Sequence, residues 1–192
     1  MAKVFNVGLI GCGHIAETYF RAHKYFNNFK ITKCADINQN AANKCAKINK
    51  IKAVSIKELL SDTDIKIILN LTIPAAHYEV AKQALLNGKH VYSEKPLAIN
   101  FQDGKKLIKL AKKKKLYVGN APDTFLGGGS QKSRDLLDKK VIGKVIFGNA
   151  IFAYPGIQSY HPNPESWFAK KGGGPVVDMG PYYLTCLLYT SD

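Results

Sequence analysis

The stretch that most constrains the fold is GLIGCGHIA at residues 8–16, which follows an apolar run and opens a helical pattern. It contains the spacing Gly11-x-Gly13-x-x-Ala16. Gly11 allows a tight turn, Gly13 lets the backbone approach a pyrophosphate, and the small Ala16 lets the helix pack closely on the strand. A glycine turn without a ligand has the same spacing, so the pattern needs support from its surroundings. Because the pattern lies between a strand and a helix, it predicts a dinucleotide-binding turn, with the anion at the helix N-terminus.

An acidic residue provides that support. Asp36 stands in KCADIN after the second apolar run, 20 residues beyond Ala16, as expected for such a turn. Its carboxylate can accept hydrogen bonds from both hydroxyls of an adenosine ribose and would repel a 2′-phosphate. Because no arginine follows it, we expect NAD rather than NADP. His14 and Ile15, which begin the predicted helix, complete the expected cofactor contacts of the turn.

Residues 1–120 alternate short β-branched runs with helical patterns. This alternation is typical of βαβ units, which right-handed crossovers arrange as a doubly wound parallel sheet. We therefore expect an α/β fold with a dinucleotide-binding domain at 1–120. Strands are expected at 4–10, 30–35, 53–54, 65–71, 90–93 and 116–118, and helices at 14–26, 39–48, 56–60, 75–87 and 101–114.

Beyond residue 120 the pattern changes, and we expect a second domain at 121–192. A helix and turn are predicted at 130–143 and a long strand at 144–154, followed by an aperiodic stretch rich in Gly, Pro and Ser at 155–174. A single strand of about ten residues has no neighbour with which to form a stable sheet. The second domain is therefore expected to be incomplete.

The net charge of +14 suggests a nucleic-acid partner. However, 26 of the 28 basic residues are lysine, because arginine occurs only at 21 and 134, and arginine is the better reader of phosphates and bases. We therefore favour a solvated surface and expect no nucleic-acid partner.

The cysteines at 12, 34, 45 and 186 show no ligand spacing, so neither a disulfide framework nor a metal site is expected. No run suits a membrane span or a secretory signal, which predicts a cytoplasmic protein without a membrane partner.

Two predicted strands end in residues that are unusual for a sheet. Thr72, Pro74 and His77 follow the fourth strand in NLTIPAAH, and Glu94 and Lys95 follow the fifth in SEKPLA. Ligands of doubly wound sheets bind beyond the carboxyl ends of the strands. Lys95 would point into the crevice where the nicotinamide must lie, and there it could orient a substrate hydroxyl.

The stretch DMGPYY at 178–183 follows three glycines. Asp178 and Tyr182 share one face of a helix. Pro175 suits the first turn of a helix. Pro181 would disrupt a helix deep in its interior and is tolerable if the helix begins nearer Asp178 than Pro175. From spacing alone, an aspartate cap followed by core tyrosines is the better interpretation. Tyr183 is the more probable core residue.

Taken together, GLIGCGHIA, Asp36, TIPAAH, EKPLA and GGGPVVDMGPYY resemble the glucose–fructose oxidoreductase and inositol dehydrogenase family (Gfo/Idh/MocA) over nearly the whole chain. The resemblance implies a Rossmann domain followed by an α/β substrate domain that usually mediates oligomer contacts, so a full-length homo-oligomer is expected. It implies hydride transfer between NAD(P) and a carbinol carbon of a sugar, cyclitol or related polyol. It also implies catalytic roles for Lys95, Asp178 and Tyr182, and a cofactor side lined by Thr72, Pro74, His77 and Glu94.

The chain departs from the family pattern in two ways. Tyr182 stands where the family's DxGxH motif has a histidine, the usual proton acceptor. The ending CLLYTSD does not continue the pattern, so we expect a truncated frame and a longer natural protein. Three alternatives to a dehydrogenase follow: an NAD-binding regulatory protein without turnover, an NAD-using glycosidase of the same family, and an inactive fragment.

Overall fold

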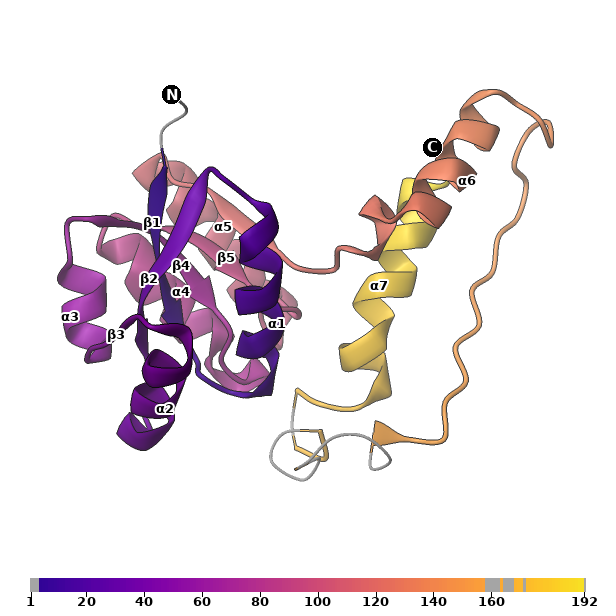
Figure 1. Ribbon diagram of the computed structural model, residues 1–192. Helices are drawn as coiled ribbons and strands as arrows, with labels where there is room; N and C mark the ends of the chain where they lie inside the picture. The colour runs from indigo at the N-terminus through magenta and orange to yellow at the C-terminus, as the bar shows by residue number, and fades with distance from the viewer. Residues whose placement is uncertain (1–3, 158–162, 164–167, 171, 192) are drawn as a thin grey trace. The chain divides into compact units, whose positions relative to one another are not determined.

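The structure, a computed structural model, describes residues 4–157, 163, 168–170 and 172–191. The chain divides into two compact units, Met1–Ala121 and Pro122–Asp192, and each is described by itself (Figure 1).

The first unit is built on one sheet of six parallel strands in the order β3-β2-β1-β4-β5-β6. The order reverses beside β1, which pairs with β2 on one side and with β4 on the other. Such a reversal is the point at which doubly wound sheets bind ligands. The predicted doubly wound α/β fold is therefore confirmed. The strands are β1 (Phe5–Ile10), β2 (Phe29–Ala35), β3 (Lys52–Ala53), β4 (Ile65–Asn70), β5 (His90–Ser93) and β6 (Val118–Asn120).

Helices cover both faces of this sheet (Figure 1). They are α1 (His14–Ala22), which a 3-10 turn at His23–Tyr25 extends, α2 (Gln39–Asn49), α3 (Ile56–Ser61), α4 (Pro74–Leu86) and α5 (Phe101–Lys114). Successive side chains of a strand point to opposite faces. Val7 and Leu9 of β1 accordingly pack with α1 and α2, whereas Ile10 packs with α3, α4 and α5. These two apolar layers fix the sheet and hence the loops at its carboxyl edge.

The last strand begins later than the sequence predicts. A strand is expected from residue 116, but the backbone N–H of Leu116 still donates to the carbonyl of Ala111 at the end of α5. Lys115 before it adopts a left-handed conformation, with φ of 55°. The chain therefore finishes closing the helix before it can join the sheet at Val118.

The second unit contains a 3-10 turn at Thr124–Leu126 and two helices, α6 (Gly128–Asp138) and α7 (Pro175–Tyr189). The predicted strand at 144–154 is wrong, because the structure assigns no strand there. Its apolar side chains are largely exposed, with Ile146 92% and Ile151 82% accessible. A strand needs a neighbour for its N–H and C=O groups, and the described residues of this unit provide none.

Candidate cofactor and substrate site

The glycine turn after β1 is held against the loop after β4. Gly11 has φ of +102°, and a Cβ at this position would lie 2.5 Å from the carbonyl carbon and oxygen of Leu71. The N–H of Leu71 donates to the carbonyl of Ile10 at 2.8 Å, so the two backbones are joined there. Gly11 is thus required by both backbone conformation and space.

The surroundings of Gly13 are open, in contrast to the crowded surroundings of Gly11. It is the N-cap residue of α1, with φ of −79°, and no side chain caps the helix. A Cβ at Gly13 would meet nothing within 4 Å. The first turn of α1, which holds His14 and Ile15, therefore has no capping side chain at Gly13 and has room beside that residue, as an anion site at a helix N-terminus requires. Ala16, 3% exposed, packs on the core side of the same turn.

Asp36 follows β2 directly and joins its loop to the glycine turn. One carboxylate oxygen, Oδ2, accepts a hydrogen bond from the N–H of Cys12 at 2.7 Å, and Oδ1 accepts one from the N–H of Asn38 at 2.8 Å. Each carboxylate oxygen keeps acceptor capacity for a further donor. The acid is therefore fixed beside the turn and can still accept hydrogen bonds from ribose hydroxyls.

The loop after β4 is organised by a buried amide and a buried imidazole. Asn70, fully buried, donates to the carbonyl of His77 at 2.9 Å and accepts a hydrogen bond from the hydroxyl of Thr72 at 2.7 Å. Pro74 begins α4, at a position where its missing N–H costs nothing. The ring of His77 is 1% exposed.

The two ring nitrogens of His77 connect two strand-end loops. Nδ1 lies 2.6 Å from the carbonyl oxygen of Pro96, and Nε2 lies 2.9 Å from that of Thr72. Which nitrogen donates depends on the ring's tautomer. His77 thus braces the loop after β4 against the loop that carries Lys95. Its predicted contact with the cofactor stays a prediction.

Glu94 and Lys95 follow β5, and three contacts hold the loop that carries them. The hydroxyl of Tyr19 on α1 donates to Oε1 of Glu94 at 2.9 Å. The backbone N–H of Glu94 donates to the carbonyl of Asn70 at 2.9 Å. The side-chain amide of Asn120 donates to the carbonyls of Ser93 and Glu94 at 2.9 and 3.0 Å. Lys95 is therefore presented from a loop tied to α1, β4 and β6.

Sequence reasoning missed Tyr19, Asn70 and Asn120. Asn70 and Asn120 are amides at the ends of apolar strand runs, a signal that the sequence does contain. The contact of Tyr19 with Glu94 joins residues 75 apart, and no local pattern marks it.

Asp178 and Tyr182 lie in the second unit, four residues apart on α7, and both are half-buried. The helix begins at Pro175, so the expected place of Pro175 in a first turn is confirmed. It also continues through Pro181, so the condition of a start nearer Asp178 is not met. A proline disfavours helical geometry in the residue before it mainly through that residue's N–H and Cβ. Here the residue is Gly180, which has no Cβ. Asp178 still falls in the first turn, and its N–H donates to Gly174 at 2.9 Å.

The predicted residues therefore form two sets. The residues of the first unit gather at the carboxyl ends of β1, β2, β4 and β5, and the residues of the second unit share one helix. The assembly of these two sets into one site stays a prediction.

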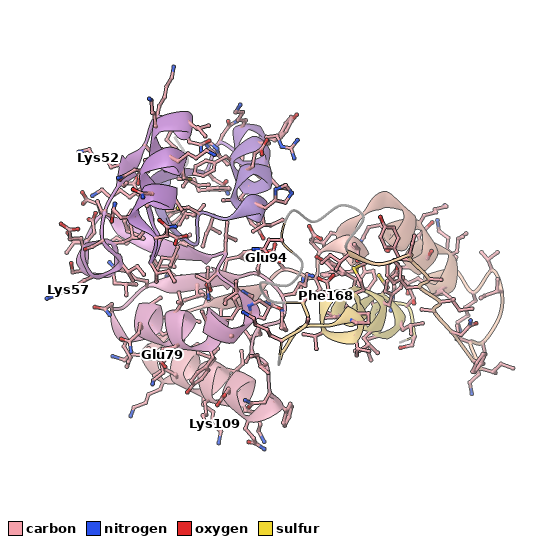
Figure 2. The ribbon with its side chains drawn as sticks, turned by 90° about the horizontal axis from the view of Figure 1, so that it is seen from below. Lys52, Lys57, Glu79, Glu94, Lys109 and Phe168 are labelled. Atoms are coloured by element: carbon pink, nitrogen blue, oxygen red, sulfur yellow. The ribbon has the colours of Figure 1, made fainter. Side chains whose placement is uncertain are left out.

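A hollow of about 670 Å³ elsewhere in the first unit has a different character. It lies beside residues 30–33 of β2, away from the carboxyl edge, and its ionisable lining residues are lysines and His23. Lysines also project outward from α3 and α5, as Figure 2 shows for Lys57 and Lys109.

No helix in the described part of the chain has the length and hydrophobicity that a bilayer span requires.

The sequence matches two domain families. Residues 5–121 match the family described as "Oxidoreductase family, NAD-binding Rossmann fold", and residues 130–192 match the "GFO/IDH/MocA C-terminal domain". The chain is 34% identical to trans-1,2-dihydrobenzene-1,2-diol dehydrogenase of Xenopus laevis over 128 residues, which are 67% of this chain and 38% of that protein. The chain thus spans less than half the length of the curated relatives that it first matches.

Solved structures agree on the fold. An NAD-binding protein from Listeria innocua aligns over 98% of this chain and 55% of its own, with a TM-score of 0.81 and 22% identity. Biliverdin reductase from Synechocystis sp. PCC 6803, solved with biliverdin and NADP⁺, aligns over 70% of this chain and 43% of its own, with a TM-score of 0.62 and 30% identity. With both domain families matched along most of its length, the chain belongs to the GFO/IDH/MocA family of NAD(P)-binding oxidoreductases.

Proposed function

We propose that the protein is an NAD-dependent oxidoreductase that acts on a carbinol carbon of a sugar, cyclitol or related polyol. The observation that carries the proposal is the carboxylate of Asp36, fixed at 2.7 Å from the N–H of Cys12 in the glycine turn. A carboxylate there favours a ribose with free hydroxyls over one with a 2′-phosphate. The name of the Xenopus relative supports a diol as the kind of group oxidised. The cofactor differs among relatives, since biliverdin reductase was solved with NADP⁺, so the preference for NAD rests on Asp36.

The residues of the chain would bind the cofactor, orient the substrate and take a proton from it. The open N-terminus of α1 binds the pyrophosphate, and Asp36 binds the ribose. Bound NAD⁺ supplies the acceptor for the hydride that leaves the carbinol carbon. The ammonium group of Lys95 donates to the substrate hydroxyl oxygen and stabilises the charge that develops there. Asp178 orients that hydroxyl, and the phenolate form of Tyr182, favoured by a nearby positive charge, takes its proton, which leaves a carbonyl product.

The first test is cofactor binding. NAD and NADP are titrated calorimetrically into the chain, and we expect NAD to bind at least about tenfold more tightly, which corresponds to ~1.4 kcal/mol. Equal affinities would contradict the assignment of Asp36.

The second test is turnover of the protein from the complete coding sequence with NAD and a panel of polyols. Lys95→Ala should lower kcat/KM by about 10²–10⁴, as for loss of a group that assists proton transfer. Lys109→Ala, an exposed lysine of α5, is the matched control and should leave kcat/KM unchanged. NAD binding without turnover of any polyol would instead favour a regulatory protein.

A further inference from the structure

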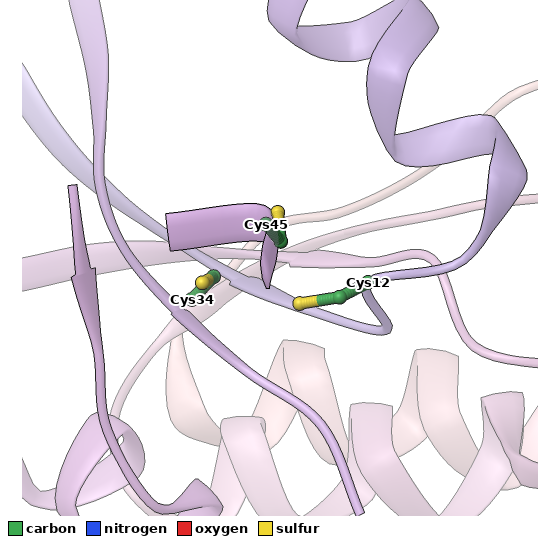
Figure 3. Close-up of side chains that lie close together, drawn as sticks. All are labelled: Cys12, Cys34 and Cys45. Atoms are coloured by element: carbon green, nitrogen blue, oxygen red, sulfur yellow. The ribbon is translucent and has the colours of Figure 1, made fainter. Parts of the chain in front are cut away.

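Three of the four cysteines lie together beside the glycine turn, although their spacing in the sequence predicts no metal site. The Sγ atoms of Cys12, Cys34 and Cys45 are all within 4.8 Å of one another (Figure 3). Cys12 belongs to the turn after β1, Cys34 to β2 and Cys45 to α2. Sequence spacing does not reveal this cluster because the fold, and not a local motif, brings the three thiols together.

The cluster is shielded from water but reachable from one side. Cys34 is fully buried and Cys45 is 9% exposed, whereas Cys12 is half-buried. The thiols of Cys12 and Cys34 contact the backbone carbonyls of Ala35 and Ala42, at 3.7 and 3.5 Å. The side-chain amide of Asn49 donates to Sγ of Cys45 at 3.8 Å. Burial raises the pKa of Cys45 to about 11. A hydrogen bond from Cys12 lowers the pKa of Cys34, and the same contact raises that of Cys12.

The spacing of the sulfurs suits a metal ion. Sulfurs bound to one ion at about 2.3 Å lie ~3.8–4.0 Å apart, so each needs to move by less than about 1 Å. Thiolates are the preferred ligands of Cu(I) and also bind Zn(II) strongly. Among the described residues no histidine, aspartate, glutamate or further cysteine joins the cluster. The set therefore provides three thiolates, which is enough for three-coordinate Cu(I), and a water would complete a zinc site.

We propose that Cys12, Cys34 and Cys45 form a binding site for one thiophilic metal ion, Cu(I) or Zn(II). Binding replaces the three thiol protons, which are released to solvent, with three metal–sulfur bonds. The site lies next to the proposed cofactor contacts but does not depend on them. Cys12 stands between Gly11 and Gly13, and its N–H is held by Asp36. A bound ion would therefore restrain the turn that faces the cofactor.

The alternative is that the three cysteines pack only as small apolar side chains, as buried cysteines often do. Metal binding distinguishes the two. The reduced, metal-free chain is titrated with Cu(I), and separately with Zn(II), each in competition with a chromophoric chelator. We expect one equivalent of at least one ion to be taken from the chelator.

Single substitutions then test which thiols bind. Cys12→Ser, Cys34→Ser and Cys45→Ser should each lower the affinity by more than the ~10–100-fold that loss of an outer-shell partner costs. Cys186→Ser is the matched control, since Cys186 lies on α7 in the second unit, and it should bind as the wild type does. Adding Cd(II) should produce thiolate-to-metal absorption in the ultraviolet that falls by about a third in each cluster variant.

Folding of the variants is checked by thermal unfolding without metal. Cys12→Ser is the decisive variant because its side chain is half-buried and the substitution disturbs the core least. Retention of wild-type affinity in folded Cys12→Ser would overturn the proposal. An equal loss of metal affinity in Cys186→Ser would overturn the proposal as well. So would failure of the wild type to take either ion from the chelator.

Discussion

The carboxylate of Asp36 accepts a hydrogen bond from the backbone N–H of Cys12, with 2.7 Å between Oδ2 and N. The acid expected to bind the ribose thus also positions the glycine turn. Asp36→Ala removes both roles and should weaken NAD binding about 10–100-fold, given ~1.5–3 kcal/mol for a hydrogen bond to a charged group. Calorimetric titration measures this loss.

Asp36→Asn separates the two roles. The amide oxygen can still accept the N–H of Cys12, but the negative charge that repels a 2′-phosphate is gone. We expect a smaller loss of NAD affinity and a rise in the ratio of NADP to NAD affinity. An unchanged ratio would show that the charge of Asp36 does not select the cofactor.

The two glycines of the turn should respond differently to the same substitution. Gly11→Ala places a Cβ 2.5 Å from backbone atoms of Leu71 in a left-handed conformation, so it should lower the free energy of unfolding by about 2 kcal/mol or more. Gly13→Ala meets nothing within 4 Å and should leave that free energy nearly unchanged while weakening NAD binding. Urea unfolding and calorimetry measure the two effects. A stable Gly11→Ala protein, or full NAD affinity in Gly13→Ala, would contradict the corresponding assignment.

The parts of the fold that could be predicted are those specified by local patterns. The apolar run at residues 5–10, the turn at Gly11 and the acid after β2 each carry their signal within a few residues, and the structure places them as expected. The strand predicted at 144–154 has the right residue types, but pairing depends on a neighbour that local patterns do not supply. α7 continues through Pro181, which the local preference against prolines in a helix interior does not predict.

The long-range contacts of the site could not be predicted for the same reason. Tyr19 reaches Glu94 and Cys12 reaches Cys34 only after β1, β2 and β5 have assembled. The family resemblance predicts functional residues at the strand ends. It did not indicate what holds them there.

His77 should contribute to stability through the ring nitrogen that donates to a carbonyl. His77→Phe fills a similar volume but leaves the carbonyls of Thr72 and Pro96 without their present partner. Because a neutral ring donates to one carbonyl and an unsatisfied buried polar group costs about 1–3 kcal/mol, we expect the free energy of unfolding to fall by ~1–3 kcal/mol. His23→Phe is the matched control, since that ring is partly exposed and contacts one carbonyl, of Phe20. A loss for His77→Phe no larger than that of the control would contradict the bracing role.

Tyr182 and Tyr183 provide the test of the proton acceptor. The ring of Tyr183 packs against Phe152 with centroids 5.3 Å apart, and Tyr183→Phe keeps that ring, so turnover should remain near the wild-type value. Tyr182→Phe removes the hydroxyl assigned to take the substrate proton, and kcat should fall by about 10²–10⁴ with little change in NAD affinity. Both variants are compared by steady-state kinetics in the protein from the complete coding sequence. If Tyr182→Phe retains full turnover, the proton passes to another base or to solvent, and Tyr182 fills the position of the family's histidine without performing its chemistry.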